Sequence, residues 1–103
     1  MFSKRDYLER NVGNKITVHG KIAEAFWQHM RKRIDSHPNM TYFDLEDDYQ
    51  IIIYSKNEIV CKGQIEITGN VIELKSDYNN PNVKIHDKFS EYHIIVDSWR
   101  CID

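Results

Sequence analysis

The residues best suited to chemistry surround a basic tripeptide, Arg31-Lys32-Arg33, which follows Trp27 closely in the sequence. Cationic side chains attract phosphates, and aromatic rings stack on the bases of single-stranded nucleic acids. Tryptophan, tyrosine and arginine also dominate many contacts between proteins. We therefore predict one site for binding a nucleic acid or a partner protein, composed of Trp27, Arg31, Lys32, Arg33, Tyr42 and Tyr54.

Several observations favour a plainer interpretation of the same residues. A short basic run is commonly a solvated loop, and Trp27 is equally suited to packing at the end of a barrel. Asp44 and the acidic turn at 46–48 would repel phosphate from this surface. The sequence also leaves open which face of the segment 49–54 points outward, and with it the role of Tyr54.

Five histidines are many for 103 residues, but their spacing does not indicate a metal site. Zinc sites need three or four ligands, which often lie at short local spacings. No two of these histidines are two or four residues apart: His19, His29, His37, His86 and His93. The acidic segment 44–48 lacks the spacing and the glycine of a calcium loop. We therefore expect no metal and no cofactor.

The chain also lacks the sequence motifs of common enzymes. There is no P-loop, G-x-G-x-x-G, G-x-S-x-G or H-E-x-x-H pattern. Cys61 and His93 offer a nucleophile and a base, but a lone cysteine beside apolar residues is usually core filling. With no CxxC pattern and no apolar signal segment near Met1, we expect reduced Cys61 and Cys101, a cytoplasmic location and no enzymatic activity.

Two similar phrases, 16–24 and 65–73, predict the elements that position these residues. Each alternates apolar and polar residues, as a half-buried strand does, and each contains a central glycine, Gly20 or Gly69. Glycines inside strands mark bulges, bends or close backbone approach. We expect both glycines at such places, and one core that contains Ile16, Val18, Ile22, Phe43, Leu45, Ile65, Ile67 and Val71.

The other patterns complete an order of elements. The predicted helices are 4–11 and a short one between the capping-box serine Ser55 and Gly63. The predicted strands are 15–27, 40–45, 49–54, 64–75 and 92–102, with loops over 29–39 and 76–91. This order predicts one all-β domain over 1–103, a five-stranded Greek-key barrel with 1–13 as an N-terminal helical extension.

From Lys15 to Trp99 the chain resembles OB domains of the anticodon-binding type. This group includes the N-terminal domains of class II lysyl and aspartyl tRNA synthetases and of the exonuclease VII large subunit. The resemblance is carried by four motifs: Ile16-Thr-Val-His-Gly-Lys-Ile22, Tyr42-Phe-Asp-Leu-Glu-Asp47, Gln50-Ile-Ile-Ile53 and Ile65-Glu-Ile-Thr-Gly-Asn-Val71. It implies an OB-fold barrel that binds ligands on its second and third strands and on the adjoining loops.

The composition limits the partners of such a barrel. A net charge of −2 provides no global field that attracts nucleic acid or acidic membranes, so attraction to phosphate must be local. No apolar run is long enough to span a membrane, so we expect no membrane partner. We predict a non-enzymatic binding module for single-stranded DNA or RNA. The alternative is a protein-interaction domain that uses the same face or a strand edge.

Overall fold

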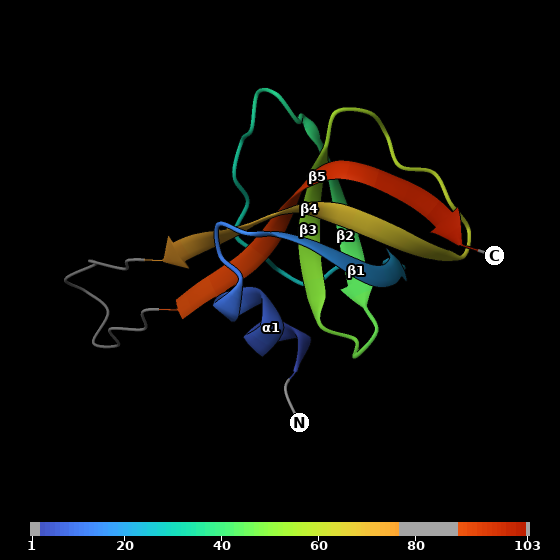
Figure 1. The fold of residues 1–103 in the computed structure, drawn as a ribbon. Coiled ribbons are helices and arrows are strands. Elements are labelled where there is room, and N and C mark those ends of the chain that lie inside the picture. The colour runs from blue at the N-terminus through green and yellow to red at the C-terminus, as the bar shows by residue number, and fades with distance from the viewer. Residues whose placement is uncertain (1–2, 77–88, 103) are drawn as a thin grey trace.

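The computed structural model describes residues 3–76 and 89–102, which form a closed five-stranded barrel with one short helix (Figure 1). The elements are α1 (Lys4–Arg10), β1 (Lys15–Ile22), β2 (Asn39–Leu45), β3 (Gln50–Ser55), β4 (Gln64–Ser76) and β5 (Phe89–Ile102). The strands close in the order β1-β2-β3-β5-β4, and only the β3–β5 pair is parallel. The prediction of an all-β, OB-like barrel is confirmed.

The helix α1 lies at one end of the barrel (Figure 1) and begins with the predicted cap. The Ser3 side chain accepts a hydrogen bond from the Asp6 backbone N–H at 3.2 Å. Leu8 is fully buried within the barrel core, so the helix contributes directly to the packing. Among the described residues, no helix is long and apolar enough to cross a membrane.

The predicted core forms as expected on the inner faces of the strands. Seven of the eight predicted residues are buried, and Ile22 is partly buried against them. Ile51 and Ile53 of β3 and Ile94 of β5 complete this core. The alternation in the sequence identified the eight predicted side chains because a strand sends successive residues to opposite faces.

The two central glycines lie where the backbone leaves no room for a side chain, as predicted. The β4–β5 register shifts between Thr68 and Gly69, which is a β-bulge. A Cβ atom on Gly69 would collide with the carbonyl oxygen of Ile95. A Cβ atom on Gly20 would lie 2.6 Å from the Phe43 ring and would collide with the Asp44 carbonyl oxygen. Both glycines are therefore required for close approach between strands.

Two predicted strand boundaries and one predicted helix are wrong. The first strand ends at Ile22 instead of residue 27, because the chain leaves the sheet after Ala23 donates to the Tyr42 carbonyl oxygen. The predicted helix after Ser55 is absent from the described residues 56–63: Ser55 belongs to β3, and its hydroxyl donates to the Asn57 carbonyl instead of capping a helix. The last strand begins at Phe89, and most of the predicted loop at 76–91 lies outside the described residues.

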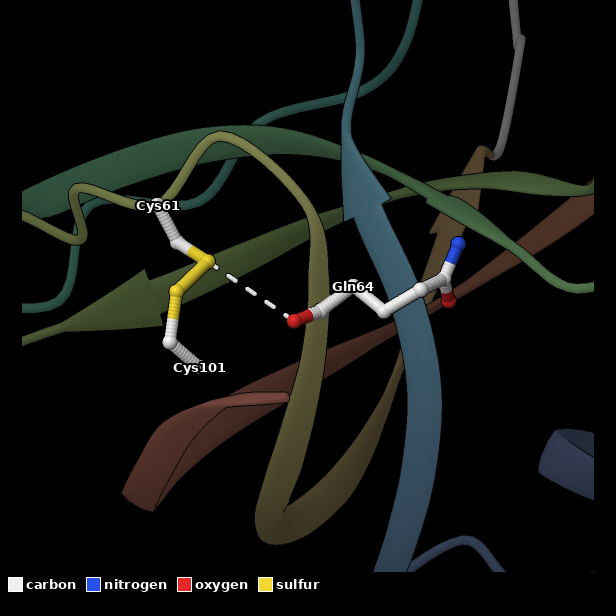
Figure 2. Close-up of a disulfide and its surroundings, with 3 residues drawn as sticks. All are labelled: Cys61, Gln64 and Cys101. Atoms are coloured by element: carbon white, nitrogen blue, oxygen red, sulfur yellow. Dashed lines mark hydrogen bonds between the residues drawn. A yellow bond between two sulfur atoms is a disulfide. The ribbon is translucent and has the colours of Figure 1, made fainter. Parts of the chain in front are cut away.

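Cys61 and Cys101 form a disulfide, contrary to the expectation of reduced thiols (Figure 2). Their Cα atoms are 6.0 Å apart, which is normal for a bridge. The reason lies in the β4–β5 pairing, which places Cys101 opposite Ile65, shortly after Cys61 in the chain. The Cys61 sulfur also lies 3.7 Å from the Gln64 carbonyl oxygen. The bridge ties the end of β5 to the segment that enters β4.

Candidate ligand-binding site

The outer face of β3 is covered by the segment 23–38, which we call the β1–β2 loop. All six residues of β3 are buried, although only Ile51 and Ile53 belong to the barrel core. Ile52 and Tyr54 point to the other side of the sheet and are also fully buried. The surface on which an OB-fold commonly binds ligands is therefore occupied in part by the chain itself.

Gln50 fastens the beginning of this loop to the barrel. Its side-chain Nε2 donates to the Ala25 carbonyl oxygen at 2.7 Å and to Asp44 Oδ1 at 3.0 Å. Its Oε1 accepts from the Trp27 backbone N–H at 2.8 Å. These three bonds determine which end of the amide carries the oxygen, because a flipped amide would oppose all of them.

Glu91 of β5 holds the middle of the loop. One carboxylate oxygen lies 2.6 Å from His29 Nδ1, and the other accepts from the Met30 backbone N–H. The second ring nitrogen of His29, Nε2, lies 2.9 Å from Gln50 Oε1. The side chains of His29 and Glu91 are only 11% and 15% exposed, so water screens this pair weakly.

Tyr54 and His93 form a third attachment, directly under the loop. The Tyr54 hydroxyl lies 2.9 Å from His93 Nδ1 and accepts from the Lys32 backbone N–H at 3.2 Å. Burial raises the pKa of Tyr54 and lowers the pKa of His93 to about 4. Within the described part of the chain, His93 Nε2 is buried without a hydrogen-bond partner.

The aromatic residues of the predicted site divide into buried and accessible ones. Tyr54 is fully buried beneath the loop, so its ring is not accessible to a ligand in this arrangement. Tyr42 is half-buried, and its ring packs against Phe26 with centroids 4.9 Å apart. Trp27 and Phe26 are each 68% exposed. Accessible aromatic surface is therefore concentrated at the start of the β1–β2 loop.

The three predicted cations remain in solvent further along the same loop. Arg31, Lys32 and Arg33 are all exposed. Arg33 lies 3.4 Å from Asp35, in an ion pair whose side chains are both more than nine-tenths exposed and which is therefore weak. Across residues 3–76 and 89–102, the side chains of Arg31 and Lys32 form no ion pair. Their charge is available to a ligand.

Two surface hollows connect the basic and aromatic parts of the site. The first, of about 540 Å³, is lined by Arg31, Lys32, Arg33, Ile34, Asp35, His37, Pro38 and Met40. The second, of about 460 Å³, contains Phe26 and Tyr42 on one side and the segment 58–62 on the other. Met40 of β2 lines both hollows, although Trp27 lines neither of them. We call these two hollows, together with the exposed Trp27 that follows Phe26 in the chain, the track.

The sequence-based prediction missed four residues that shape this region. Phe26 and Gln50 gave no signal, because an isolated apolar or amide residue has many roles. Glu91 was expected in the loop 76–91 and His93 on the last strand, so their common face became evident only because β5 begins at Phe89. With His29 they bring ligand-type atoms within 4.8 Å of one another, which the spacing of the histidines alone did not indicate.

Comparisons of the chain with models of known protein families, with curated proteins and with solved structures found no match.

Proposed function

We propose that this protein is a non-enzymatic binding module for single-stranded DNA or RNA. The strand would lie along the track from Arg31, Lys32 and Arg33, across Met40, to Phe26 and Trp27. The single observation that carries this proposal is that Met40 lines both the basic and the aromatic hollow. Single-strand binding requires cations that attract the phosphate backbone and aromatic rings on which the bases stack. The resemblance to the anticodon-binding type of OB domain supports the same ligand class.

The track differs from the usual OB-fold surface in one respect. The β1–β2 loop covers the outer side of β3, so bases would stack on Trp27 and Phe26 of the loop instead of on Tyr54. The acidic turn at 46–48 lies at the other end of the hairpin from Met40, in the register of β2 and β3. The phosphates would therefore follow the basic end of the track.

Fluorescence anisotropy with short labelled DNA and RNA oligomers, measured at several salt concentrations, tests this proposal. Three cationic contacts give a slope of log affinity against log salt of about −2, from roughly −0.7 per phosphate. Changing Arg31, Lys32 and Arg33 together to alanine should abolish binding. A control with Lys21, Lys56 and Lys75 changed to alanine removes the same charge elsewhere and should bind nearly as the parent does.

Trp27→Ala separates stacking from charge. It should weaken oligomer binding by about 1–3 kcal/mol while leaving the salt slope nearly unchanged. Equal binding by the Arg31-Lys32-Arg33 variant and its control would show that the loop is only a solvated basic segment. If the parent binds no oligomer at low salt, the nucleic-acid proposal is wrong.

A protein partner is the second candidate, and the edge of β2 favours it. β1 pairs with β2 only through residues Phe43–Leu45 of β2, with a further bond from Ala23 to Tyr42. No described strand pairs with residues 39–41 on that side. Met40 and Val60, which are 44% and 70% exposed, offer apolar contacts beside this edge. An extended peptide could add to the edge as a further strand.

The peptide candidate has its own test. Binding of an extended apolar peptide should shift the backbone amide resonances of residues 39–41, and Met40→Ser or Val60→Ser should weaken it with little salt dependence. The cytoplasmic location stays a prediction, and the disulfide bears on it, because disulfides persist mainly in oxidising compartments. Alkylation of free thiols in freshly lysed cells would report the state of Cys61 and Cys101.

A further inference from the structure

We propose that His29, Glu91 and His93 form a binding site for one transition-metal ion of the zinc type. Each residue offers a nitrogen or a carboxylate oxygen, and these three atoms lie within 4.8 Å of one another. Glu91 and His93 come from the same face of β5, and His29 comes from the β1–β2 loop above it. Two imidazoles and one carboxylate are a common ligand set for zinc, with the fourth position open to water.

His93 provides the clearest sign of a missing ligand partner. It is only 1% exposed, and its Nε2 atom has no hydrogen-bond partner among the described residues. Its other nitrogen, Nδ1, faces the Tyr54 hydroxyl at 2.9 Å. The tautomer that donates from Nδ1 to Tyr54 leaves the lone pair of Nε2 free. A buried polar atom without a partner is costly, and a metal ion would satisfy it.

Gln50 determines which ring nitrogen of His29 is available to an ion. The Gln50 amide is oriented by its bonds to Ala25, Asp44 and Trp27, so its Oε1 can only accept from His29 Nε2. That nitrogen must therefore carry a proton, and Nδ1 faces Glu91. In this structure His29 Nδ1 and the Glu91 carboxylate are hydrogen-bonded at 2.6 Å. A bound ion would replace the proton of this hydrogen bond, which leaves to solvent.

Each of the three ligands thus has a second partner of the kind that orients metal ligands. Gln50 accepts from His29, the Tyr54 hydroxyl is hydrogen-bonded to His93 Nδ1, and the Met30 backbone N–H donates to the second oxygen of Glu91. Such outer contacts set the tautomer of the histidines and the direction of the carboxylate. If these contacts served only to fasten the β1–β2 loop to the barrel, they would not need a nitrogen of His93 without a hydrogen-bond partner.

The geometry requires only a small rearrangement. Zinc–nitrogen bonds of about 2.0–2.1 Å place tetrahedral ligands roughly 3.4 Å apart. The widest pair, which lies within 4.8 Å, would approach by at most about 1.4 Å, whereas His29 Nδ1 and Glu91, now 2.6 Å apart, would separate by about 0.8 Å. His29 lies in a loop without regular secondary structure, which can move more easily than the two strand residues. The side chains of His29 and Glu91 are partly exposed, so an ion has a route from solvent.

The test is isothermal titration of the full chain with ZnCl₂, with the disulfide intact so that no cysteine thiolate competes. We expect one ion per chain with micromolar or tighter affinity. His29→Gln and Glu91→Gln should each weaken binding at least tenfold. His19→Gln and His37→Gln remove histidines outside the cluster and should leave the affinity unchanged. Titration with Co²⁺ should produce the visible absorption of a tetrahedral nitrogen–oxygen site.

Thermal melting distinguishes a metal site from contacts that only fasten the loop to the barrel. The variants used must first be shown to be folded by circular dichroism. Zinc at a hundredfold excess over Kd should raise the Tm of the parent by roughly 10–20 °C relative to EDTA, and this increase should vanish in His29→Gln. The proposal is overturned if the parent shows no saturable zinc binding below 100 µM. It is also overturned if both cluster variants bind zinc as tightly as the parent, even when they are less stable in EDTA.

Discussion

Replacing Gly69 with alanine should destabilise the barrel more than the same change at Gly13, for a reason that the structure makes specific. A Cβ atom at Gly69 would collide with the Ile95 carbonyl oxygen and lie 2.8 Å from Ile94 Cγ2. Both atoms belong to the neighbouring strand, so relief requires the β4–β5 ladder to open at the bulge. Overpacking of this kind costs about 1–3 kcal/mol, and we expect the upper part of this range.

The Gly13→Ala variant is the control, because it measures the cost of a left-handed backbone without the steric collision expected at Gly69. The φ of Gly13 is 86°, a left-handed value, but a Cβ atom there would meet nothing within 4 Å. Alanine at this position should cost only the backbone strain, about 1–2 kcal/mol. At Gly69 no left-handed value is involved, and the cost comes from contact with the neighbouring strand.

Urea denaturation of the parent and the two variants measures the difference. The free energy of unfolding should fall by about 3 kcal/mol in Gly69→Ala at an unchanged m-value, which corresponds to a Tm decrease of roughly 12–24 °C. The reasoning would be refuted if Gly69→Ala lay within 0.5 kcal/mol of the parent, or if Gly13→Ala were the more damaging change.

Three further predictions concern the core, the disulfide and acid stability. Phe43→Ala should lower the free energy of unfolding by about 3–5 kcal/mol in urea denaturation, because the ring is fully buried; a cost under 1 kcal/mol would contradict the packing. Reduction of the Cys61–Cys101 bridge, which closes a separation of 40 residues, should cost roughly 4 kcal/mol, while a Cys61→Ser/Cys101→Ser variant should not respond to reductant. The Arg100 guanidinium lowers the pKa of Glu66 from 4.5 to about 2, so this carboxylate stabilises the fold above pH 4.5 and loses its effect as the pH falls toward 2. Glu66→Gln should therefore lower the Tm at pH 6 and flatten its dependence on pH between 4.5 and 2; an unchanged acid profile would show that the contact does not matter.

The candidate site was predicted from the sequence only in its exposed parts. Trp27 and the cations of 31–33 are accessible, as expected of polar or amphipathic residues in a loop. The burial of Tyr54 could not be predicted, because the outer face of β3 looks like any strand face until the covering segment is known. The spacing of the histidines gave no sign of the His29–Glu91 contact, since these residues meet across 62 positions of the chain.

The amino-acid sequence by itself determined the order of the strands, the inner face of the alternating strands and the places that require glycine. These features follow from local alternation and from contacts that the repeated phrases imply. Only the tertiary structure decided that the β1–β2 loop lies over β3, that Cys61 meets Cys101, and that His29 joins Glu91 and His93. Such contacts depend on how separate segments meet after the barrel closes, and residue spacing along the chain carries no information about that meeting.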